Sequence, residues 1–260
     1  MENKIYNCDC VEGMRTLPDN YIDLTVASPP YDSLRTYKGF EWDFEATVKE
    51  LYRITKEGGV VVWIISDATI KGSETGTSFK QALFFKECGF NIHDTMIWYK
   101  PDRYNLGSNY CYKQTFEYMF IFSKGKPKTI NLIKDVPAKC KGKTRKSYRK
   151  QPDGRVEIDP RIYIQPEYKR RNNVWELPFL QKNHGHPAEF PEQLANDHII
   201  SWSNEGDIVL DPFMGSGTTA KMAMLNNRKY IGFEISKEYC DIAKQRIEEA
   251  QQQTSLFVSQ

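Results

Sequence analysis

Short apolar runs alternate with amphipathic segments along most of the 260-residue chain. Residues 21–27 and 60–65 are almost continuously apolar, which is typical of strands buried on both faces of a sheet. Between them, residues 44–55 have apolar side chains at helical spacing, and we expect the pair Gly58 and Gly59 to end this helix. This order predicts a strand–helix–strand unit of a parallel sheet.

The same alternation continues toward the end of the chain. We expect further helices over 77–88, 187–201 and 237–252, and further strands over 92–99, 115–122 and 229–235. Strands and helices in this order predict an α/β fold, built as a doubly wound and mostly parallel sheet of the Rossmann-like type.

Composition is that of an ordinary globular protein, with 40% hydrophobic and 27% charged residues. No apolar run has the length of a membrane span or a signal peptide, so we expect a cytoplasmic protein without a membrane partner. The six cysteines form no C-x-x-C pair and predict free thiols. His184 and His186 have no third ligand at a suitable spacing, and we therefore expect no metal.

The net charge of +2 hides a strongly basic segment. Between residues 124 and 171 there are sixteen Lys or Arg against five Asp or Glu, so this segment carries +11 and the remainder −9. Lys and Arg neutralise phosphates and supply sequence-independent affinity for nucleic acid. We expect such contacts from Lys139, Lys141, Lys143, Arg145, Lys146, Arg149, Lys150, Lys169, Arg170 and Arg171.

The basic segment also suggests how the chain is divided. We expect one domain formed by 1–123 and 173–260, interrupted by an insertion at 124–172. The insertion is rich in Tyr, Pro and Gly and has little periodicity, so a flexible solvated loop is the alternative to a nucleic-acid contact.

A four-residue motif, Ser28-Pro29-Pro30-Tyr31, follows the apolar run 21–27 directly. It therefore occupies the carboxyl end of a buried strand, where open α/β sheets bind ligands. The prolines fix their own φ and lack N–H groups, so neighbouring carbonyls have no local donor. Oxygen acceptors beside an aromatic ring suit a planar ligand with an exocyclic amino group. An ordinary surface turn is an equal alternative on these four residues alone.

A glycine turn lies within residues 208–220, between an apolar strand and a helix that runs to about Asn226. Gly215 and Gly217 allow a ligand to approach the backbone closely, because a Cβ there would obstruct it. We expect the helix to be capped by Ser216, Thr218 or Thr219.

The strand after this turn ends near Glu234, nineteen residues beyond Gly215. That is the usual spacing for a carboxylate that accepts hydrogen bonds from ribose hydroxyls, so the pair predicts a nucleoside-cofactor site. A P-loop is disfavoured because no Gly-Lys-Ser or Gly-Lys-Thr sequence is present. A dinucleotide site stays open, because Gly215 to Ala220 formally matches G-x-G-x-x-A.

Together, these segments resemble the DNA amino-methyltransferases. Residues 28–31 look like the family's D/N/S-P-P-Y/F/W catalytic motif, and 211–219 look like its D-P-F-x-G-S-G-T-T cofactor motif. The catalytic motif comes first, as in the permuted β class. Weaker matches lie at 7–10, 17–19 and 186–191.

This resemblance implies a Rossmann-like methyltransferase fold, S-adenosyl-L-methionine as cofactor and double-stranded DNA as partner. Ser28 Oγ and the Pro29 carbonyl would accept the amino hydrogens of a flipped-out base, and Tyr31 would stack on it. The segment 124–172 would be the target-recognition insertion. The implied cofactor residues are Asp9, Cys10, His186, Asp211, Pro212, Phe213, Gly215, Ser216, Gly217, Thr218 and Glu234.

Within the family, Ser at the first motif position is associated mostly with cytosine N4, so we expect that product, with adenine N6 as the alternative. A cognate restriction endonuclease is a further candidate partner, and a monomer or a homodimer is expected. Two other classes stay open, a nicotinamide-dependent oxidoreductase and a non-catalytic DNA-binding protein. The favoured interpretation requires motifs about 185 positions apart to share one pocket.

Overall fold

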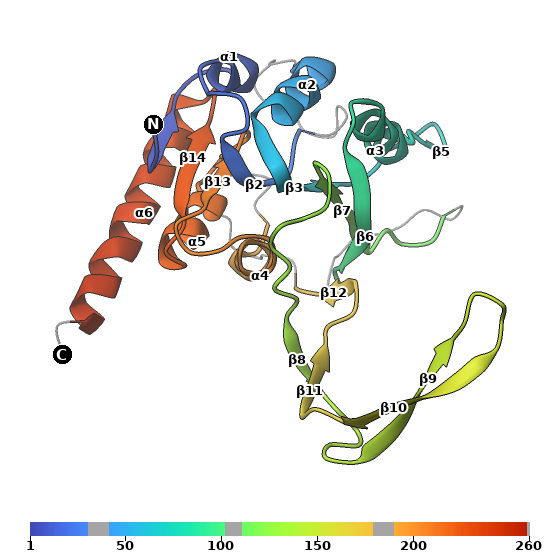
Figure 1. Ribbon diagram of the computed structural model, residues 1–260. Coiled ribbons are helices and arrows are strands. Elements are labelled where there is room, and N and C mark those ends of the chain that lie inside the picture. The colour runs from blue at the N-terminus through green and yellow to red at the C-terminus, as the bar shows by residue number, and fades with distance from the viewer. Residues whose placement is uncertain (31–41, 102–110, 179–189, 259–260) are drawn as a thin grey trace. The chain divides into compact units, whose positions relative to one another are not determined.

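β2 (Ile22–Ala27) and β3 (Thr55–Ile65) lie side by side and parallel in an eight-stranded sheet. The structure, a computed structural model, describes residues 1–30, 42–101, 111–178 and 190–258. Across the sheet the strand order is β1-β14-β13-β2-β3-β7-β6-β12 (Figure 1). The other strands are β1 (Lys4–Tyr6), β6 (Asn91–Tyr99), β7 (Phe116–Ser123), β12 (Val174–Glu176), β13 (Ile208–Asp211) and β14 (Lys229–Phe233).

β7 alone runs against its neighbours in this sheet, because it pairs antiparallel with both β3 and β6. The remaining pairs are parallel. The expected doubly wound, mostly parallel sheet is therefore confirmed, with one reversed strand that the apolar pattern did not reveal.

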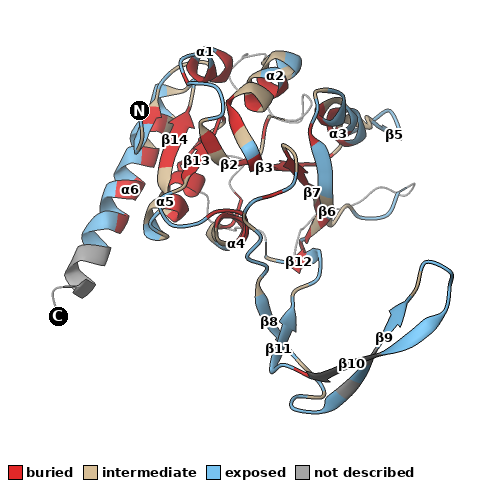
Figure 2. Cartoon of the chain, viewed as in Figure 1, coloured by how far each residue is buried: buried red, intermediate tan, exposed pale blue. Residues whose placement is uncertain are grey.

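Helices cover both faces of the sheet. The side chains of β3 alternate between two hydrophobic clusters, with Val60 and Val62 in one and Val61 and Trp63 in the other. The first cluster is completed by α4 (Glu192–Trp202), α5 (Thr218–Leu225) and α6 (Lys237–Val258). The second is completed by α1 (Cys10–Arg15), α2 (Phe44–Ile54) and α3 (Thr77–Glu87). In Figure 2, β7, β13 and β14 are coloured mostly as buried, whereas much of β6 is coloured as exposed.

α2 ends earlier than expected. Asp43 caps its start by accepting a 3.0 Å hydrogen bond from the Ala46 N–H. Thr55 is already extended and begins β3, with its hydroxyl donating to the Leu51 carbonyl at 2.6 Å. The expectation that Gly58 ends the helix was wrong, because β-branched Thr55 joins the sheet directly and Gly58 lies inside β3 at φ +81°.

Two other helix starts also differ from expectation. α4 begins at Glu192 after the cap residue Pro191, so the predicted helical state of Phe190 and Pro191 was wrong, and 187–189 lie outside the described residues. α5 is capped by Gly217 in a left-handed conformation and not by a Ser or Thr side chain. The turn before α5 needs a positive φ at this position, which glycine adopts without strain.

A second compact unit spans Leu132–Asn172, and the rest of the chain forms the first unit. The second unit contains the antiparallel pair β8 (Lys134–Pro137) with β11 (Tyr168–Arg170). It also contains the hairpin of β9 (Thr144–Lys150) with β10 (Val156–Ile164). The first unit carries one more short pair, β4 (Thr69–Ile70) with β5 (Ser73–Glu74). In the described part of the chain, no helix is both long and apolar enough to span a membrane.

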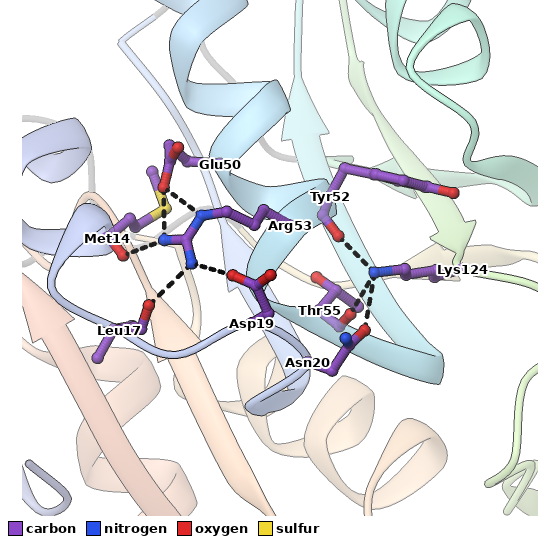
Figure 3. Close-up of polar contacts among 9 residues, drawn as sticks. All are labelled: Met14, Leu17, Asp19, Asn20, Glu50, Tyr52, Arg53, Thr55 and Lys124. Carbon is purple, nitrogen blue, oxygen red and sulfur yellow. Dashed lines mark hydrogen bonds and ion pairs between the residues drawn. The ribbon is translucent and has the colours of Figure 1, made fainter.

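Arg53 of α2 joins the segments that lead into β2 (Figure 3). Its guanidinium donates to the Met14 and Leu17 carbonyls, both at 2.9 Å, and to Asp19 at 2.6 Å. Two further bonds reach Glu50 one turn earlier, at 2.7 and 3.0 Å. All these contacts lie at the amino ends of the parallel strands, away from the strand tips that carry the two motifs.

Lys124 makes a second anchor at this end of the sheet (Figure 3). Its Nζ donates to the carbonyls of Tyr52 and Thr55 at 2.8 and 3.0 Å and to Asn20 Oδ1 at 2.9 Å. The end of β7 is thereby tied to the segments before β2 and β3.

Replacing Arg53 should destabilise the fold without altering the strand tips. We expect Arg53→Met to lower the free energy of unfolding by about 2 kcal/mol, since partly buried carbonyls lose charge-assisted donors. Lys49→Met is the matched control on the same helix, because Lys49 and its partner Glu45 are 62% and 64% exposed and such a pair is worth less than about 0.5 kcal/mol. Urea unfolding measures the free energy of unfolding of both variants. Equal decreases for the two would contradict the anchoring role of Arg53.

Candidate functional site

The two sequence motifs emerge at the same edge of the sheet. β2 and β13 are neighbouring parallel strands, with Leu24 opposite Val209 and Thr25 opposite Leu210. Ser28 follows the end of β2, and the glycine turn follows the end of β13. The carboxyl ends of adjacent parallel strands are where doubly wound sheets bind ligands.

Thr219 joins the two strand tips directly. Its hydroxyl lies 2.7 Å from Asp211 Oδ2 and 3.3 Å from the carbonyl oxygen of Val26. Val26 is two residues before Ser28, so the fold brings the beginning of the Ser28 motif next to the helix that follows the glycine turn. The two motifs therefore lie together at one edge, as the sequence interpretation requires.

The glycine turn packs tightly against α6. Gly215 and Gly217 have φ of +50° and +84°. A Cβ at Gly217 would come within 2.7 Å of the Ala243 Cβ, so only glycine fits here. The Met214 N–H donates to the Phe233 carbonyl at 2.9 Å and the Gly217 N–H to the Met214 carbonyl at 2.9 Å. The turn is thus held by its own backbone hydrogen bonds and by α6. The expected open approach to Gly217 was wrong, because Ala243 takes the space that a Cβ would fill.

Asp211 shapes this turn from inside. The residue is only 2% exposed. Its Oδ1 accepts a 3.0 Å bond from the Phe213 N–H, and its Oδ2 accepts the 2.7 Å bond from Thr219. Burial raises the pKa of Asp211 to about 7, although both hydrogen bonds act in the opposite direction. Pro212 is buried beside it, and Phe213 is half-buried.

Glu234 stands at the end of β14 and reaches back to the glycine turn. Its Oε2 accepts from the Gly215 N–H and its Oε1 from the Ser236 N–H, both at 2.8 Å. Burial raises the pKa of this carboxyl group. A carboxylate has about four acceptor positions, so the bonds from Gly215 and Ser236 do not exhaust it and it can still accept from other donors such as ribose hydroxyls.

Asp9 and Cys10 lie at the start of α1, just after β1. Asp9 Oδ1 caps the helix by accepting from the Val11 and Glu12 N–H groups at 2.8 and 3.1 Å. Cys10 is buried, its Sγ lies 3.7 Å from Thr47 Oγ1, and burial raises the pKa of its thiol to about 12. Its thiol is therefore a protonated packing group.

The Ser28 motif presents two acceptors at the tip of β2. Ser28 is half-buried and Pro29 is buried. Within the described residues, neither Ser28 Oγ nor the Pro29 carbonyl has a hydrogen-bond donor, whereas the Pro30 carbonyl accepts from Trp42 Nε1 at 2.9 Å. Tyr31 and His186 lie outside the described residues.

Arg246 of α6 supports the glycine turn and was missed by the sequence interpretation. Its Nη1 donates to both the carbonyl and the hydroxyl of Ser216 at 2.7 Å and lies 3.3 Å from Thr218 Oγ1. Its Nη2 donates to Glu192 at 2.8 Å, at the start of α4. The available signal was an arginine on the buried side of a helix, since the neighbouring residues Ala243, Ile247 and Ala250 belong to the core.

The ten basic residues that the sequence predicts to contact nucleic acid fall into two groups. Lys141 pairs with Glu167 at 2.5 Å, and Arg171 pairs with Asp135 and lowers its pKa. The second group consists of the other predicted contact residues whose side chains the structure describes, and they have no ion-pair partner among the described side chains. They are Lys139, Lys143, Lys146, Arg149, Lys150, Lys169 and Arg170, and all are exposed. The side chain of Arg145 is not described.

Metal ligation finds no support in the described residues. No group of three or more His, Cys, Asp or Glu side chains is arranged there to hold an ion.

Comparison with known proteins shows which family the chain resembles in sequence. A DNA methylase family model matches residues 22–245. The orphan methyltransferase M.BamHII of Bacillus amyloliquefaciens is 59% identical over 238 residues, covering 88% of this chain and 89% of that protein. The DNA adenine methyltransferase YhdJ of Escherichia coli (strain K12) is 28% identical over 263 residues, covering 95% and 83%.

A solved structure shares the fold. The PvuII DNA methyltransferase, described as cytosine-N4-specific, aligns with a TM-score of 0.68 at 21% identity, over 94% of this chain and 85% of that chain. At this identity the likeness bears on the fold alone.

Proposed function

Because the chain belongs to the N6/N4 DNA methylase family, we propose that it methylates cytosine at N4 in double-stranded DNA, with S-adenosyl-L-methionine as methyl donor. The observation that carries the proposal is the contact of Thr219 with both Asp211 and the Val26 carbonyl. It keeps the Ser28 acceptor and the glycine turn at one edge of the sheet, as a direct methyl transfer requires.

The glycine turn is the proposed site of the methionine portion of the cofactor, held by backbone groups near Phe213, Gly215 and Gly217. Asp211, Pro212, Ser216 and Thr218 would act by shaping this turn. Glu234 would accept from the ribose, Asp9 from the adenine amino group through its second carboxylate oxygen, and His186 would reach the methionine end, with Cys10 packing behind Asp9. A nicotinamide-dependent oxidoreductase would leave the Ser28 motif and the basic segment without a role.

The reaction needs hydrogen-bond acceptors at the amino group. The lone pair of an exocyclic amino nitrogen is delocalised into the base, which makes that nitrogen a poor nucleophile. Ser28 Oγ and the Pro29 carbonyl would accept its two hydrogens and direct the lone pair at the methyl group of the cofactor. The base must leave the duplex to reach them, and stacking on Tyr31 would offset part of that energy.

The choice of base rests on Ser28. Ser at the first motif position favours cytosine N4 within the family, as the sequence interpretation expected. Adenine N6 is the second candidate, because the relative named a DNA adenine methyltransferase is 28% identical along 95% of this chain. Both bases carry an amino group in a similar ring environment, so the same two acceptors could serve either.

A direct assay tests the proposed activity and the base together. The purified protein is incubated with unmethylated plasmid and S-adenosylmethionine labelled in its methyl group, and the DNA is then digested to nucleosides. We expect label in N4-methylcytosine. Label in N6-methyladenine alone would overturn the cytosine assignment, and unlabelled DNA would overturn the methyltransferase proposal.

The second unit is the proposed DNA-contacting part. Leu132–Asn172 contains thirteen Lys or Arg against five Asp or Glu. Three of those five acids pair with Lys141, Arg155 or Arg171, so most of the basic side chains keep their charge available for phosphates.

The 59% identical relative is named an orphan methyltransferase, which supports action on DNA without a cognate endonuclease.

Charge reversal on β9 should weaken DNA binding. Lys146 and Lys150 are exposed and lie on the same side of the strand. We expect the double variant Lys146→Glu/Lys150→Glu to bind DNA at least about tenfold more weakly and to reduce the slope of log affinity against log salt by about 2. Titration of labelled DNA at several salt concentrations measures both quantities.

The matched control is Lys86→Glu, at another exposed lysine, in the last turn of α3. It should leave DNA affinity and the salt slope unchanged. If reversal at 146 and 150 does no more than reversal at 86, the hairpin is not part of the DNA interface.

A further inference from the structure

Trp42 touches both motifs of the site. Its indole Nε1 donates a 2.9 Å hydrogen bond to the carbonyl of Pro30. Its ring packs edge to face against the ring of Phe213 in the glycine turn, with centroids 5.1 Å apart. One side chain, twelve residues after Pro30, therefore connects the acceptor motif with the cofactor turn.

The Pro30 carbonyl is the group through which the motif's backbone can be locked. Ring closure fixes φ at Pro29 and Pro30, and a residue followed by proline is confined to an extended ψ, which restrains Ser28 and Pro29. Pro30 is followed by Tyr31, so its own ψ has no such restraint. A hydrogen bond to the Pro30 carbonyl holds the planar peptide group that leads to Tyr31.

The same hydrogen bond also assigns the acceptors. Three oxygens of the motif could compete for an amino group, namely Ser28 Oγ and the carbonyls of Pro29 and Pro30. Trp42 already donates to the Pro30 carbonyl, whereas Ser28 Oγ and the Pro29 carbonyl have no donor among the described residues. Ser28 Oγ and the Pro29 carbonyl are then the two acceptors for the amino hydrogens. Two fixed acceptors can orient the lone pair of the amino nitrogen.

Trp42 is itself held in an aromatic cluster. Its ring lies at 85° to that of Phe44, with centroids 5.7 Å apart, and 6.2 Å from that of Trp63. Trp63 is fully buried and donates from its own Nε1 to Gln81 at 2.8 Å. Packing of this kind restricts the indole to one orientation, so its N–H points steadily at Pro30.

We propose that Trp42 is a positioning residue for methyl transfer. It restrains the ψ angle of Pro30 through the Pro30 carbonyl and sets the Ser28 motif against the glycine turn through Phe213. The inference rests on the proposed methyltransferase function. Trp42 then affects the rate of methyl transfer, whereas affinity for the cofactor depends on the glycine turn and Glu234.

The test compares two Trp→Phe variants that each lose one indole N–H. Trp42→Phe keeps an aromatic ring near Phe213 but cannot donate to Pro30. Trp98→Phe is the matched control, because the Trp98 Nε1 also donates to a backbone carbonyl at 2.9 Å, that of Leu177, and β6 lies three strands away from β2. Single-turnover methyl transfer, cofactor affinity and thermal stability are measured for both proteins and for the wild type.

We expect Trp42→Phe to slow single-turnover transfer by about tenfold or more, with cofactor affinity changed by less than about threefold. The transfer rate of Trp98→Phe should stay within about twofold of the wild type. Equal transfer rates for the two variants, or a loss confined to cofactor affinity, would overturn the positioning role. Failure of the proposed function is a separate result, because it would appear as a wild-type protein that transfers no methyl group.

Discussion

Ser28→Ala should lower the rate of methyl transfer by about a hundredfold, or about 2.7 kcal/mol of transition-state stabilisation. The hydroxyl is one of two oxygens proposed to accept the amino hydrogens. Its removal leaves the Pro29 carbonyl, so residual activity is expected. Cofactor affinity should stay unchanged, because the glycine turn and Glu234 make no hydrogen bond with Ser28 Oγ among the described residues.

The rate is measured as single-turnover transfer with saturating DNA and cofactor. Ser123→Ala is the control: this serine is buried at the end of β7, at the opposite edge of the sheet, and its hydroxyl donates to the Gly125 carbonyl at 2.8 Å. It should retain the wild-type rate. Ser28→Asn restores an acceptor oxygen, and Asn is one of the residues found at this position of the family motif, so this variant should recover part of the activity. A Ser28→Ala protein within about fivefold of the wild type would exclude the hydroxyl from the chemistry.

Asp211→Asn should remove a large pH dependence of stability. With a native pKa of about 7, the Asp211 carboxyl keeps its proton in the folded protein across a range in which the unfolded chain releases it. The stabilisation is therefore fully present below the ordinary Asp pKa and is lost as pH rises through about 7. Asn mimics the protonated group and can keep both contacts, accepting from the Phe213 N–H and donating to Thr219.

Urea unfolding of both proteins between pH 5 and pH 8 measures the effect. The unfolding free energy of the wild type should fall relative to that of Asp211→Asn by about 3 kcal/mol over this range, with most of the change complete near pH 7. Other titrating groups are shared by the two proteins and largely cancel in the difference.

Asp241→Asn is the control for this measurement. Asp241 is exposed, and its hydrogen bond with Lys237 lowers its pKa, so it stays ionised throughout. Its exchange should shift stability equally at every pH. A constant difference for Asp211→Asn as well would mean that Asp211 is ionised in the folded protein at pH 5.

Much of the fold followed from local pattern. The continuous apolar runs before Ser28 and before the glycine turn became neighbouring buried strands, because a strand covered on both faces needs apolar side chains at every position. The two motifs could be found in the same way, since each combines special backbone geometry with a place directly after such a run. The sheet order and the reversed direction of β7 could not be found, because strand pairing depends on distant segments.

Helix boundaries show where local pattern fails. The pair Gly58 and Gly59 predicted a helix end, yet Thr55 had already joined β3 beside β2. At α5, hydroxyl side chains predicted a cap, yet the cap residue is Gly217, because close packing on Ala243 and a positive φ admit no side chain there. In both places a tertiary contact overrode the local preference.

The sequence by itself determined the strand tips and the residue types proposed to carry the chemistry, because apolar periodicity, proline, glycine and hydroxyl groups act within a few residues of one another. Tertiary structure alone decided which groups support that chemistry. Trp42 reaches Pro30 and Phe213, Thr219 reaches Val26, and Arg246 reaches Ser216 only after the sheet has formed. Such contacts join residues far apart in the chain, so their energies depend on the packed arrangement and leave little trace in local pattern.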